Sequence, residues 1–305
     1  MKEEKVLTVC LSPAFQNTYV MEDFCENEVN RATGKMNIEA SGKGINVIRV
    51  LSQLGRGATC LMQVGGLRAN EFLSICQRES LEVDPVFCDS DVRCCTTVIN
   101  GKSGTSTELV ENAHAVSEQT DKAVRERFLS LIEGCHALVI SGTKAPGFGP
   151  DIYPWMVKKA KEKGLLVVVD IKGKELKSCL EYGPDIVKPN LSEFVSTFFE
   201  GLTVAENEDS ENLKESIMEK AAELYRCYGV KTVLSRGKFD TWAFDGKNPV
   251  TVPAIEAKVV NTIGCGDSMT AGLVDALLDK KPFDEAIHFG MQCATRRATH
   301  LHQGL

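Results

Sequence analysis

The sequence has 305 residues, of which 43% are apolar and 25% charged, proportions typical of a folded globular chain and not of a disordered one. The net charge of −7 argues against a strongly basic nucleic-acid-binding surface. The longest unbroken apolar run, Leu165–Val169, is far shorter than the ~20 residues of a membrane-spanning helix, so no contact with a membrane is expected.

Short apolar runs alternate with amphipathic stretches along most of the chain, which predicts strands that are each followed by a helix. Continuous apolar strands joined in this way are typical of a parallel sheet with helices on both faces. The predicted strands are Val6–Leu11, Ala58–Val64, Ala137–Ser141, Leu165–Asp170, Asp185–Lys188 and Val230–Ser235. The predicted helices are Ile45–Gly55, Asn70–Ser80, Asp121–Ile132, one beginning near Asp151, Gly173–Leu180 and Glu211–Tyr228.

Two regions interrupt this alternation. Residues 18–38 contain few helix formers and many turn residues, and residues 93–109 have the pattern of a hairpin with a glycine-containing turn at Gly101–Gly104. We interpret them as parts of a small β-rich subdomain or lid. The chain is therefore expected to form one α/β domain over residues 1–305, with lid segments at about 12–40 and 91–112.

The twelve cysteines include no C-x-x-C pair, and the first residues mix acidic and basic side chains where a secretory signal would have an apolar run. A disulfide framework is therefore disfavoured. Reduced thiols and a cytoplasmic location are the expectation.

Glycine-rich segments raise the question of nucleotide binding, but two common motifs are excluded. No Walker A loop is present, because Thr96 stands where the first glycine before Gly101 would be. Neither Gly42–Gly44 nor Gly264–Gly266 completes a G-x-G-x-x-G dinucleotide fingerprint.

The most informative stretch is Asn261–Leu273, which joins a strand-like segment, Lys258–Val260, to an apolar helix predicted over Ser268–Leu278. Gly264 and Gly266 allow a sharp turn with exposed N–H groups, and the helix N-terminus adds a positive dipole end. Such a turn is suited to binding an anion.

Asp267 is unexpected at a turn that would bind an anion, because its carboxylate would repel a phosphate group. It could be a simple N-cap of the helix. Alternatively, it could be a general base that takes a proton from an attacking hydroxyl group while the nearby N–H groups hold a transferring phosphoryl group.

The same stretch, NTIGCGDSMTAGL, resembles the C-terminal signature of the pfkB, or ribokinase-like, carbohydrate kinases, with Cys265 in place of the usual alanine of GAGD. Ser41–Gly55 (SGKGINVIRVLSQLG) resembles the N-terminal signature of that family. Together with VNR at Val29–Arg31, it is similar to the branch that contains 1-phosphofructokinase and tagatose-6-phosphate kinase.

Two further segments follow the family in order. DIVKPNLSEF (Asp185–Phe194) is similar to the K-P-N-x-x-E segment, and VLSRG (Val233–Gly237) lies where the family has its S-x-G nucleotide loop. The resemblance implies a Rossmann-like, ribokinase-like α/β fold with a small β lid. It also implies phosphorylation of a sugar hydroxyl group with ATP and Mg²⁺, with Asp267 as the base and the Gly264, Cys265 and Gly266 backbone as the anion hole.

On the sugar side, the glycines at Gly42 and Gly44 permit close approach of a ligand, Asn46 can bond to hydroxyl groups, and Lys43 supplies a charge. Arg31 and Arg93 lie in the two lid-like segments, where the resemblance implies that they hold a phosphate group already on the substrate. This favours a ketohexose phosphate over a free sugar or nucleoside.

Gln16 departs from the N-P-A-x-D pattern of this branch, in which the aspartate contacts sugar hydroxyl groups. Glutamine carries no charge, and Ser12 replaces the asparagine of the same motif, so the identity of the sugar stays open.

On the nucleotide side, Lys188, Asn190 and Glu193 follow a predicted strand. Asn190 and Glu193 fit a capping box at the start of a helix. The resemblance implies instead that they organise hydrated Mg²⁺ and phosphates, that Lys188 faces the nucleotide phosphates, and that Ser235 and Gly237 border the ATP pocket.

The sequence thus predicts a sugar-phosphate kinase whose partners are a sugar phosphate and ATP. Two alternatives remain: a kinase of the same fold acting on a free sugar or nucleoside, and a sugar-phosphate-binding regulator without catalytic activity. An exposed lid sheet would also be able to pair with a second copy as a homodimer.

Overall fold

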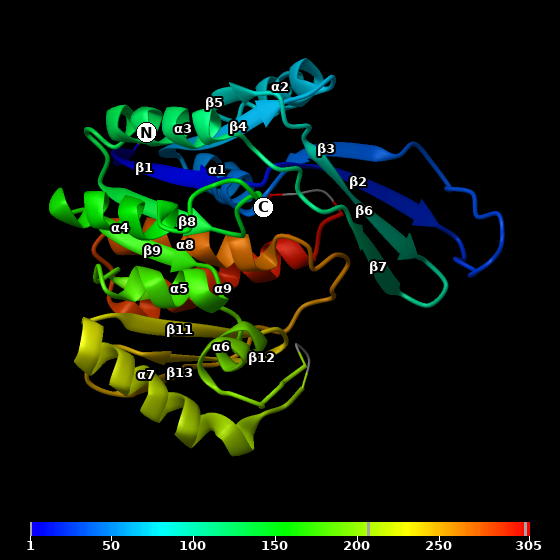
Figure 1. Ribbon diagram of the computed structural model, residues 1–305. Helices are drawn as coiled ribbons and strands as arrows, with labels where there is room; N and C mark the ends of the chain where they lie inside the picture. Colours follow the sequence, from blue (N-terminus) through cyan, green and yellow to red (C-terminus); the bar gives the residue numbers. More distant parts are fainter. Residues whose placement is uncertain (1, 206–207, 302–303) are drawn as a thin grey trace.

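The computed structural model describes residues 2–205, 208–301 and 304–305, and its strands form a larger and a smaller sheet (Figure 1). Over these residues the larger sheet has nine strands, in the order β13-β12-β11-β10-β9-β8-β1-β4-β5. Their bounds are β1 Lys2–Cys10, β4 Arg56–Gly65, β5 Val83–Cys88, β8 Ala137–Ser141, β9 Leu166–Asp170, β10 Ile186–Val187, β11 Lys231–Arg236, β12 Phe239–Phe244 and β13 Pro249–Val252.

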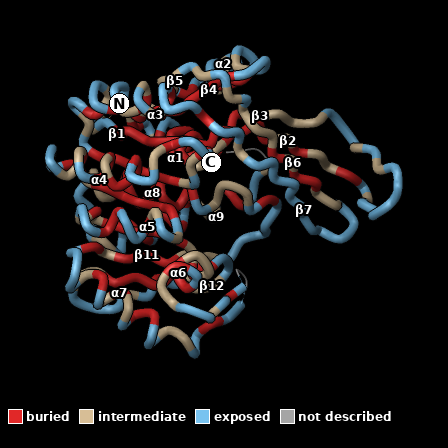
Figure 2. Tube along the Cα trace, in the orientation of Figure 1, coloured by how far each residue is buried: buried red, intermediate tan, exposed pale blue. Residues whose placement is uncertain are grey.

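The six predicted strands are confirmed as β1, β4, β8, β9, β10 and β11, and they pair in parallel. Their continuous apolar sequences are explained by burial on both faces, which Figure 2 shows as the red centre of the molecule. At one edge, β12 and β13 run antiparallel to their neighbours, a feature that the alternation of strands and helices did not predict.

Helices cover both faces of this sheet, and two separate apolar clusters divide them into groups. One face carries α1 Lys43–Gln53, α2 Ala69–Arg78, α8 Cys265–Leu278 and α9 Phe283–Ala298. The other carries α3 Glu118–Leu131, α4 Ile152–Glu162, α5 Gly173–Leu180, α6 Leu191–Phe198 and α7 Lys214–Tyr228. All the predicted helices are confirmed, whereas α9 was not predicted.

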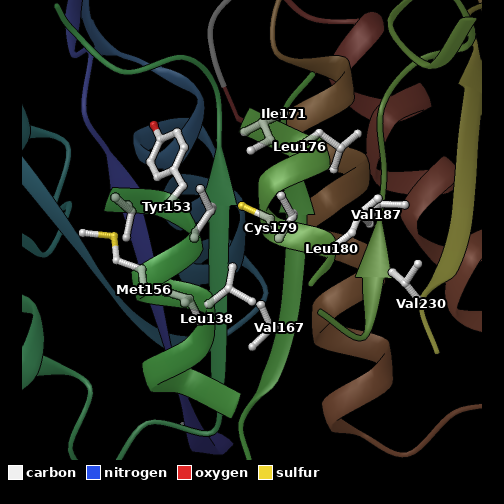
Figure 3. Close-up of a cluster of buried hydrophobic side chains, with 14 of the residues drawn as sticks. Leu138, Tyr153, Met156, Val167, Ile171, Leu176, Cys179, Leu180, Val187 and Val230 are labelled. Atoms are coloured by element: carbon white, nitrogen blue, oxygen red, sulfur yellow. The ribbon is translucent and has the colours of Figure 1, made fainter. Parts of the chain in front are cut away.

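The cluster under α4 and α5 shows how the core supports the edge of the sheet where ligands are expected. Leu138, Met156 and Val167 pack between these helices and the strands (Figure 3). The buried ring of Tyr153 belongs to the same cluster, but its hydroxyl group donates to the Gly142 carbonyl oxygen at 3.1 Å. The core therefore fixes the backbone just after β8.

The smaller sheet has the order β3-β2-β6-β7 and extends to one side of the core (Figure 1). Its strands are β2 Ala14–Met21, β3 Asn37–Ser41, β6 Arg93–Asn100 and β7 Thr105–Val110, all drawn from the two segments that interrupt the alternation. The predicted hairpin is confirmed as β6 and β7, joined through Gly101–Gly104.

The structure also tests the strand predicted at Lys258–Val260 and the expected state of the cysteines. Lys258–Val260 is not a strand: it lies in an exposed irregular segment before α8 and pairs with no strand in the part of the chain that the structure describes. All twelve cysteines are free thiols, and only Cys25 and Cys227 are exposed.

Within the described ranges, no helix has both the length and the apolar character needed to cross a membrane. The cytoplasmic location stays a prediction.

The order of the strands indicates where a ligand would bind. β1 lies between β4 and β8. After β1, the chain adds β4 and β5 on one side of it and then adds β8 and the later strands on the other side. In open α/β sheets, ligands bind beyond the carboxyl ends of the strands near such a reversal.

Candidate active site

A cavity of about 1090 Å³ opens at the carboxyl ends of the central strands. This volume is slightly above the ~300–1,000 Å³ typical of small-molecule pockets. Among the residues that line it are Lys43, Asp170, Lys188, Asn190, Glu193, Ser235, Gly237, Gly264, Cys265, Gly266 and Asp267. The nucleotide-side residues and the turn before α8, far apart in the sequence, thus share one cavity.

Asp267 lies in the first turn of α8, on the wall of this cavity, and is 5% exposed. The N-cap of α8 is Gly264, in the left-handed conformation (φ 80°), so the interpretation of Asp267 as an N-cap is wrong. Its carboxylate instead accepts a hydrogen bond from Asn46 Nδ2 at 2.8 Å, and Oδ1 has no hydrogen-bond partner among the described residues.

The backbone N–H groups of this turn differ from one another. Among the described residues, those of Gly264, Gly266 and Asp267 have no hydrogen-bond acceptor, as expected for the first turn of a helix. The Cys265 N–H, however, donates to the Thr262 carbonyl oxygen at 3.2 Å, which corrects the expectation that it is free. A Cβ atom on Gly266 would meet nothing within 4 Å, so this side of the turn is open.

Burial raises the pKa of Asp267 to about 6, with a further contribution from the nearby Asp170. Lys43, the hydrogen bond from Asn46, and Lys188 act in the opposite direction. A carboxyl group with this pKa is ionised at neutral pH and close to the range in which it can accept and release a proton.

Asp170, at the end of β9, is the residue that the sequence analysis missed. It is almost completely buried and lies 3.2 Å from Lys188 Nζ and 3.7 Å from Lys43 Nζ. Thr270 Oγ1 in α8 also donates to it, at 3.1 Å. Burial alone would raise the pKa of Asp170, but the two lysines outweigh that effect and hold the pKa below its ordinary value.

Lys43, at the start of α1, extends between the carboxylates of the cavity. Asp170 is the main cause of the raised pKa of Lys43, with Asp267 and Glu193 adding to it. The helix can begin this close to β1 because Gly44 has no side chain: a Cβ atom there would lie 2.6 Å from the Val9 carbonyl oxygen. Gly42 precedes the helix as its N-cap.

A second cavity, of about 170 Å³, shares Lys43, Asp170 and Glu193 with the first. Arg93, at the start of β6, lines it on the side of the small sheet, together with Ser12. Arg93 Nη1 donates to the Glu111 carbonyl oxygen at 3.0 Å. Of the predicted sugar-side residues, Lys43 and Arg93 line this cavity, whereas Gly42 and Asn46 line neither cavity and lie beside Lys43 at the start of α1.

Gln16 and Arg31 are not brought to these cavities. The buried amide group of Gln16 donates to Thr97 Oγ1 at 2.9 Å and to the Asn17 carbonyl oxygen at 3.2 Å, inside the small sheet. Arg31 is exposed in the loop between β2 and β3, at the far end of that sheet (Figure 1). The sequence motif could not reveal this separation, because it depends on how far the sheet extends.

Asn190 and Glu193 form the predicted capping box of α6. Asn190 Oδ1 accepts from the Glu193 N–H at 2.7 Å, and Glu193 Oε2 accepts from the Asn190 N–H at 3.2 Å. The other Glu193 oxygen lies 3.7 Å from Lys172 Nζ and 4.0 Å from Lys43 Nζ.

The donor atoms on the cavity wall include carboxylate and amide oxygens, the ligands that Mg²⁺ prefers. Among the described residues, no group of three or more His, Cys, Asp and Glu side chains could hold a metal ion by itself. Because Asp170 and Glu193 already have lysine partners, the site fits a hydrated Mg²⁺ held through water and phosphate oxygens, not a cage of protein ligands.

The fold and the cavity together define an α/β protein with a cavity, between strand ends and a helix N-terminus, that is suited to a small anionic ligand. Compared with known families, residues 9–301 match the pfkB family of carbohydrate kinases. The chain belongs to this family and is a phosphotransferase.

Solved structures agree with this assignment. Escherichia coli phosphofructokinase-2 in complex with fructose-6-phosphate is 24% identical, with 97% of this chain and 94% of that chain covered and a TM-score of 0.85. The tetrameric inhibited form of the same enzyme gives the same values. A Thermotoga maritima protein described as a possible 1-phosphofructokinase is 25% identical, with 99% and 95% covered and a TM-score of 0.86.

Proposed function

We propose that the chain transfers the γ-phosphoryl group of ATP to a hydroxyl group of a ketohexose phosphate, with Asp267 as the general base. The position of Asp267 carries this proposal: a buried carboxylate on the wall of a large cavity, one residue after a turn with free N–H groups. An acid at an anion-binding turn is explained if it accepts the proton of the attacking group.

In the proposed reaction, the substrate hydroxyl group loses its proton to Asp267 and its oxygen attacks the γ-phosphorus in line. The bond from phosphorus to the bridging oxygen breaks, and ADP leaves with the electron pair. The N–H groups of Gly264 and Gly266, which have no acceptor among the described residues, would stabilise the charge on the transferring oxygens. Mg²⁺, when bound, would neutralise part of the phosphate charge.

The larger cavity suits the nucleotide. The buried Lys188 supplies a cation on its wall, and Ser235, near the end of β11, and Gly237, just after β11, also line it. Asp170 holds Lys188 at 3.2 Å and so keeps this buried cation in place for the phosphates.

The smaller cavity suits the sugar phosphate, because Lys43 and Arg93 both line it and both can bind a phosphate group. The solved phosphofructokinase-2 complex with fructose-6-phosphate adds support for a substrate that already carries a phosphate. Gln16 and Asn46 are both buried and already bonded, so the contacts to the sugar hydroxyl groups are left to other residues that line the cavity.

The Asp267→Asn variant tests the base. We expect it to bind ATP normally while kcat falls by about 10³-fold, within the range for loss of a general base. Asp284→Asn, which changes an exposed acid in the first turn of α9, is the matched control and should behave as the unchanged protein. Turnover of the Asp267 variant within a few-fold of normal would sink the assignment.

A coupled assay of ADP release identifies the substrate class. Fructose 1-phosphate, tagatose 6-phosphate and fructose 6-phosphate should give much higher kcat/KM than fructose, tagatose or a nucleoside. A preference for an unphosphorylated acceptor would establish the alternative kinase. Ligand-induced thermal stabilisation without ADP production would establish the non-catalytic regulator.

Arg93→Ala tests the phosphate contact. We expect KM for the sugar phosphate to rise about tenfold with KM for ATP unchanged, because one charge-assisted contact is lost on the sugar side only. Arg31→Ala is the comparison, since Arg31 lies outside both cavities in one copy of the chain. Equal effects of the two variants would show that Arg31 also reaches the substrate.

We further propose that the small sheet is a lid that also pairs with a second copy. Every residue of the edge strand β7 is exposed, and Leu109 and Val110 are 60% and 57% exposed. A strand with one unpaired edge and exposed apolar side chains favours association with another strand. Val110→Lys should therefore lower the mass of the particle in analytical ultracentrifugation, and an unchanged mass would exclude pairing through β7.

A further inference from the structure

Arg49 lies in α1 and lines neither of the two cavities, yet its buried guanidinium group contacts three different elements. Nη1 donates to Asn46 Oδ1 at 2.8 Å. Nη2 donates to the carbonyl oxygen of Ala40 in β3 at 2.5 Å and to Glu79 Oε2, just after α2, at 2.6 Å. A planar guanidinium group can hold several acceptors in fixed directions, which a lysine cannot.

The bond to Asn46 determines how that amide group is oriented. Because Asn46 Oδ1 accepts from a cation, the NH₂ end must face the other way, and there Nδ2 donates to Asp267 Oδ2 at 2.8 Å. A flipped amide would place its oxygen against the Asp267 carboxylate and its NH₂ group against the guanidinium, so both contacts would become repulsive. Ser41 Oγ also donates to Asn46 Oδ1, at the longer distance of 3.4 Å, so Arg49 is the nearer and the charged one of these two donors, and it selects the orientation supporting Asp267.

We propose that Arg49 is a positioning residue for phosphoryl transfer: through Asn46 it holds Asp267 Oδ2 and leaves Oδ1 directed to the substrate hydroxyl group. This inference rests on the proposed role of Asp267. It assigns a function to a buried ion pair, Arg49 with Glu79, that would otherwise be explained by stability alone.

The electrostatic surroundings of Asp267 fix the direction of the expected effect. The charged groups that face it are Lys43 from α1, Asp170 from β9, Lys188 after β10 and Arg297 from α9, with the Cys265 thiol on its own helix. The bond from Asn46 lowers the pKa of Asp267. If that bond is lost, the pKa rises further above its ordinary value, and the carboxylate is protonated over a wider range of pH.

The test compares three variants. Arg49→Met removes every donor, and Arg49→Lys keeps the cation beside Glu79 but loses the planar arrangement. Glu79→Gln is the control, because it breaks the same ion pair while Arg49 can still bind Asn46 and Ala40. All three should lose stability, but only the Arg49 variants should change the behaviour of Asp267.

Two measurements separate positioning from folding. The first is a ¹³C NMR titration of aspartate-labelled protein without substrate, in which Asp267→Asn assigns the resonance. We expect the Asp267 midpoint to rise by about half a pH unit or more in both Arg49 variants, as loss of one hydrogen bond to a carboxylate implies. The second is kcat for fructose 6-phosphate and fructose 1-phosphate, expected to fall about tenfold with KM for ATP unchanged, as for a slightly misplaced catalytic group.

The outcomes are distinct. If Arg49→Met does not fold, Arg49→Lys still decides. The positioning role would be overturned if Arg49→Lys had the same Asp267 midpoint and the same kcat as the unchanged protein. It would also be overturned if Glu79→Gln shifted both quantities as much as the Arg49 variants do. Loss of turnover in Asp267→Asn together with unaffected Arg49 variants would leave the proposed function standing without it. If the Asp267 midpoint shifts in the Arg49 variants but Asp267→Asn has normal turnover, Asp267 is not the general base. The effect of Arg49 on the pKa of Asp267 would then still stand.

Discussion

The carboxyl end of β9 and the N-terminus of α8 each present a buried aspartate to the same cavity, and the two surroundings have opposite effects. Asp170 has two lysines within 4 Å, and its pKa is held below its ordinary value. Asp267 has no ion-pair partner at that distance among the described residues, and its pKa is raised to about 6. Both aspartates are buried, so burial does not distinguish them. Asp170 stays ionised because Lys188 and Lys43 lie close to it, whereas Asp267, without such a partner, can accept a proton near neutral pH.

The largest expected effect is on stability, from Asp170→Asn. This change leaves the buried Lys188 without its counter-ion, so the free energy of unfolding should fall by about 3–5 kcal/mol. Urea denaturation measures it. Ser141→Ala, which removes only a neutral partner at 3.4 Å, should cost far less. Equal losses in the two variants would show that Asp170 is not the electrostatic anchor of the cavity.

Asp267→Asn should have the opposite effect on stability. The pKa of Asp267 in the folded protein, about 6, lies above its ordinary value of 3.8, so ionisation opposes folding as pH rises through 6. At pH 8 the variant should therefore be more stable than the unchanged protein, by at most about 3 kcal/mol. Below about pH 4 the difference should vanish, since the acid is then protonated in both states. A variant that is less stable at pH 8 would contradict the raised pKa.

The smallest expected effect is a shift in the pH dependence of kcat, from Lys43→Met. This variant removes the cation that faces both Asp170 and Asp267. In the unchanged protein kcat should fall below pH 6, where Asp267 becomes protonated. Because Lys43 lowers the pKa of Asp267, its loss should move this acid limb up by about one pH unit. Lys122→Met, which removes an exposed lysine of α3 outside both cavities, is the control and should leave the limb in place.

The parallel part of the fold was predictable because strands buried on both faces have continuous apolar sequences, as Leu165–Asp170 does. The antiparallel edge was not, since β12 and β13 follow β11 without an intervening helix. Lys258–Val260 has the composition of a strand but pairs with no strand among the described residues, and local propensity cannot detect a missing partner.

Sequence motifs predicted those parts of the candidate site that lie within continuous segments of the chain. The turn at Gly264–Asp267 and the segment around Lys43 were both identified, and both line the cavity. The importance of Asp170 was hidden, because its lysine partners are remote in sequence and meet it only when parallel strands align their ends. The buried amide of Gln16 likewise depends on the register of β2 with β6, which no motif specifies.

The packing of α8 on α9 has a consequence for the reaction. A Cβ atom on Gly272 would lie 2.9 Å from the Gly290 Cα atom, and one on Gly290 would lie 2.7 Å from the Met269 carbonyl oxygen. Backbone atoms cannot give way as a flexible side chain does, so a single added methyl group would tilt one helix against the other. Gly272 is about 9 Å along the axis from Gly266. The two glycines at this helix crossing therefore fix the direction of the Gly264 and Gly266 N–H groups, more than one helical turn away, which we propose bind the oxygens of the transferring phosphoryl group.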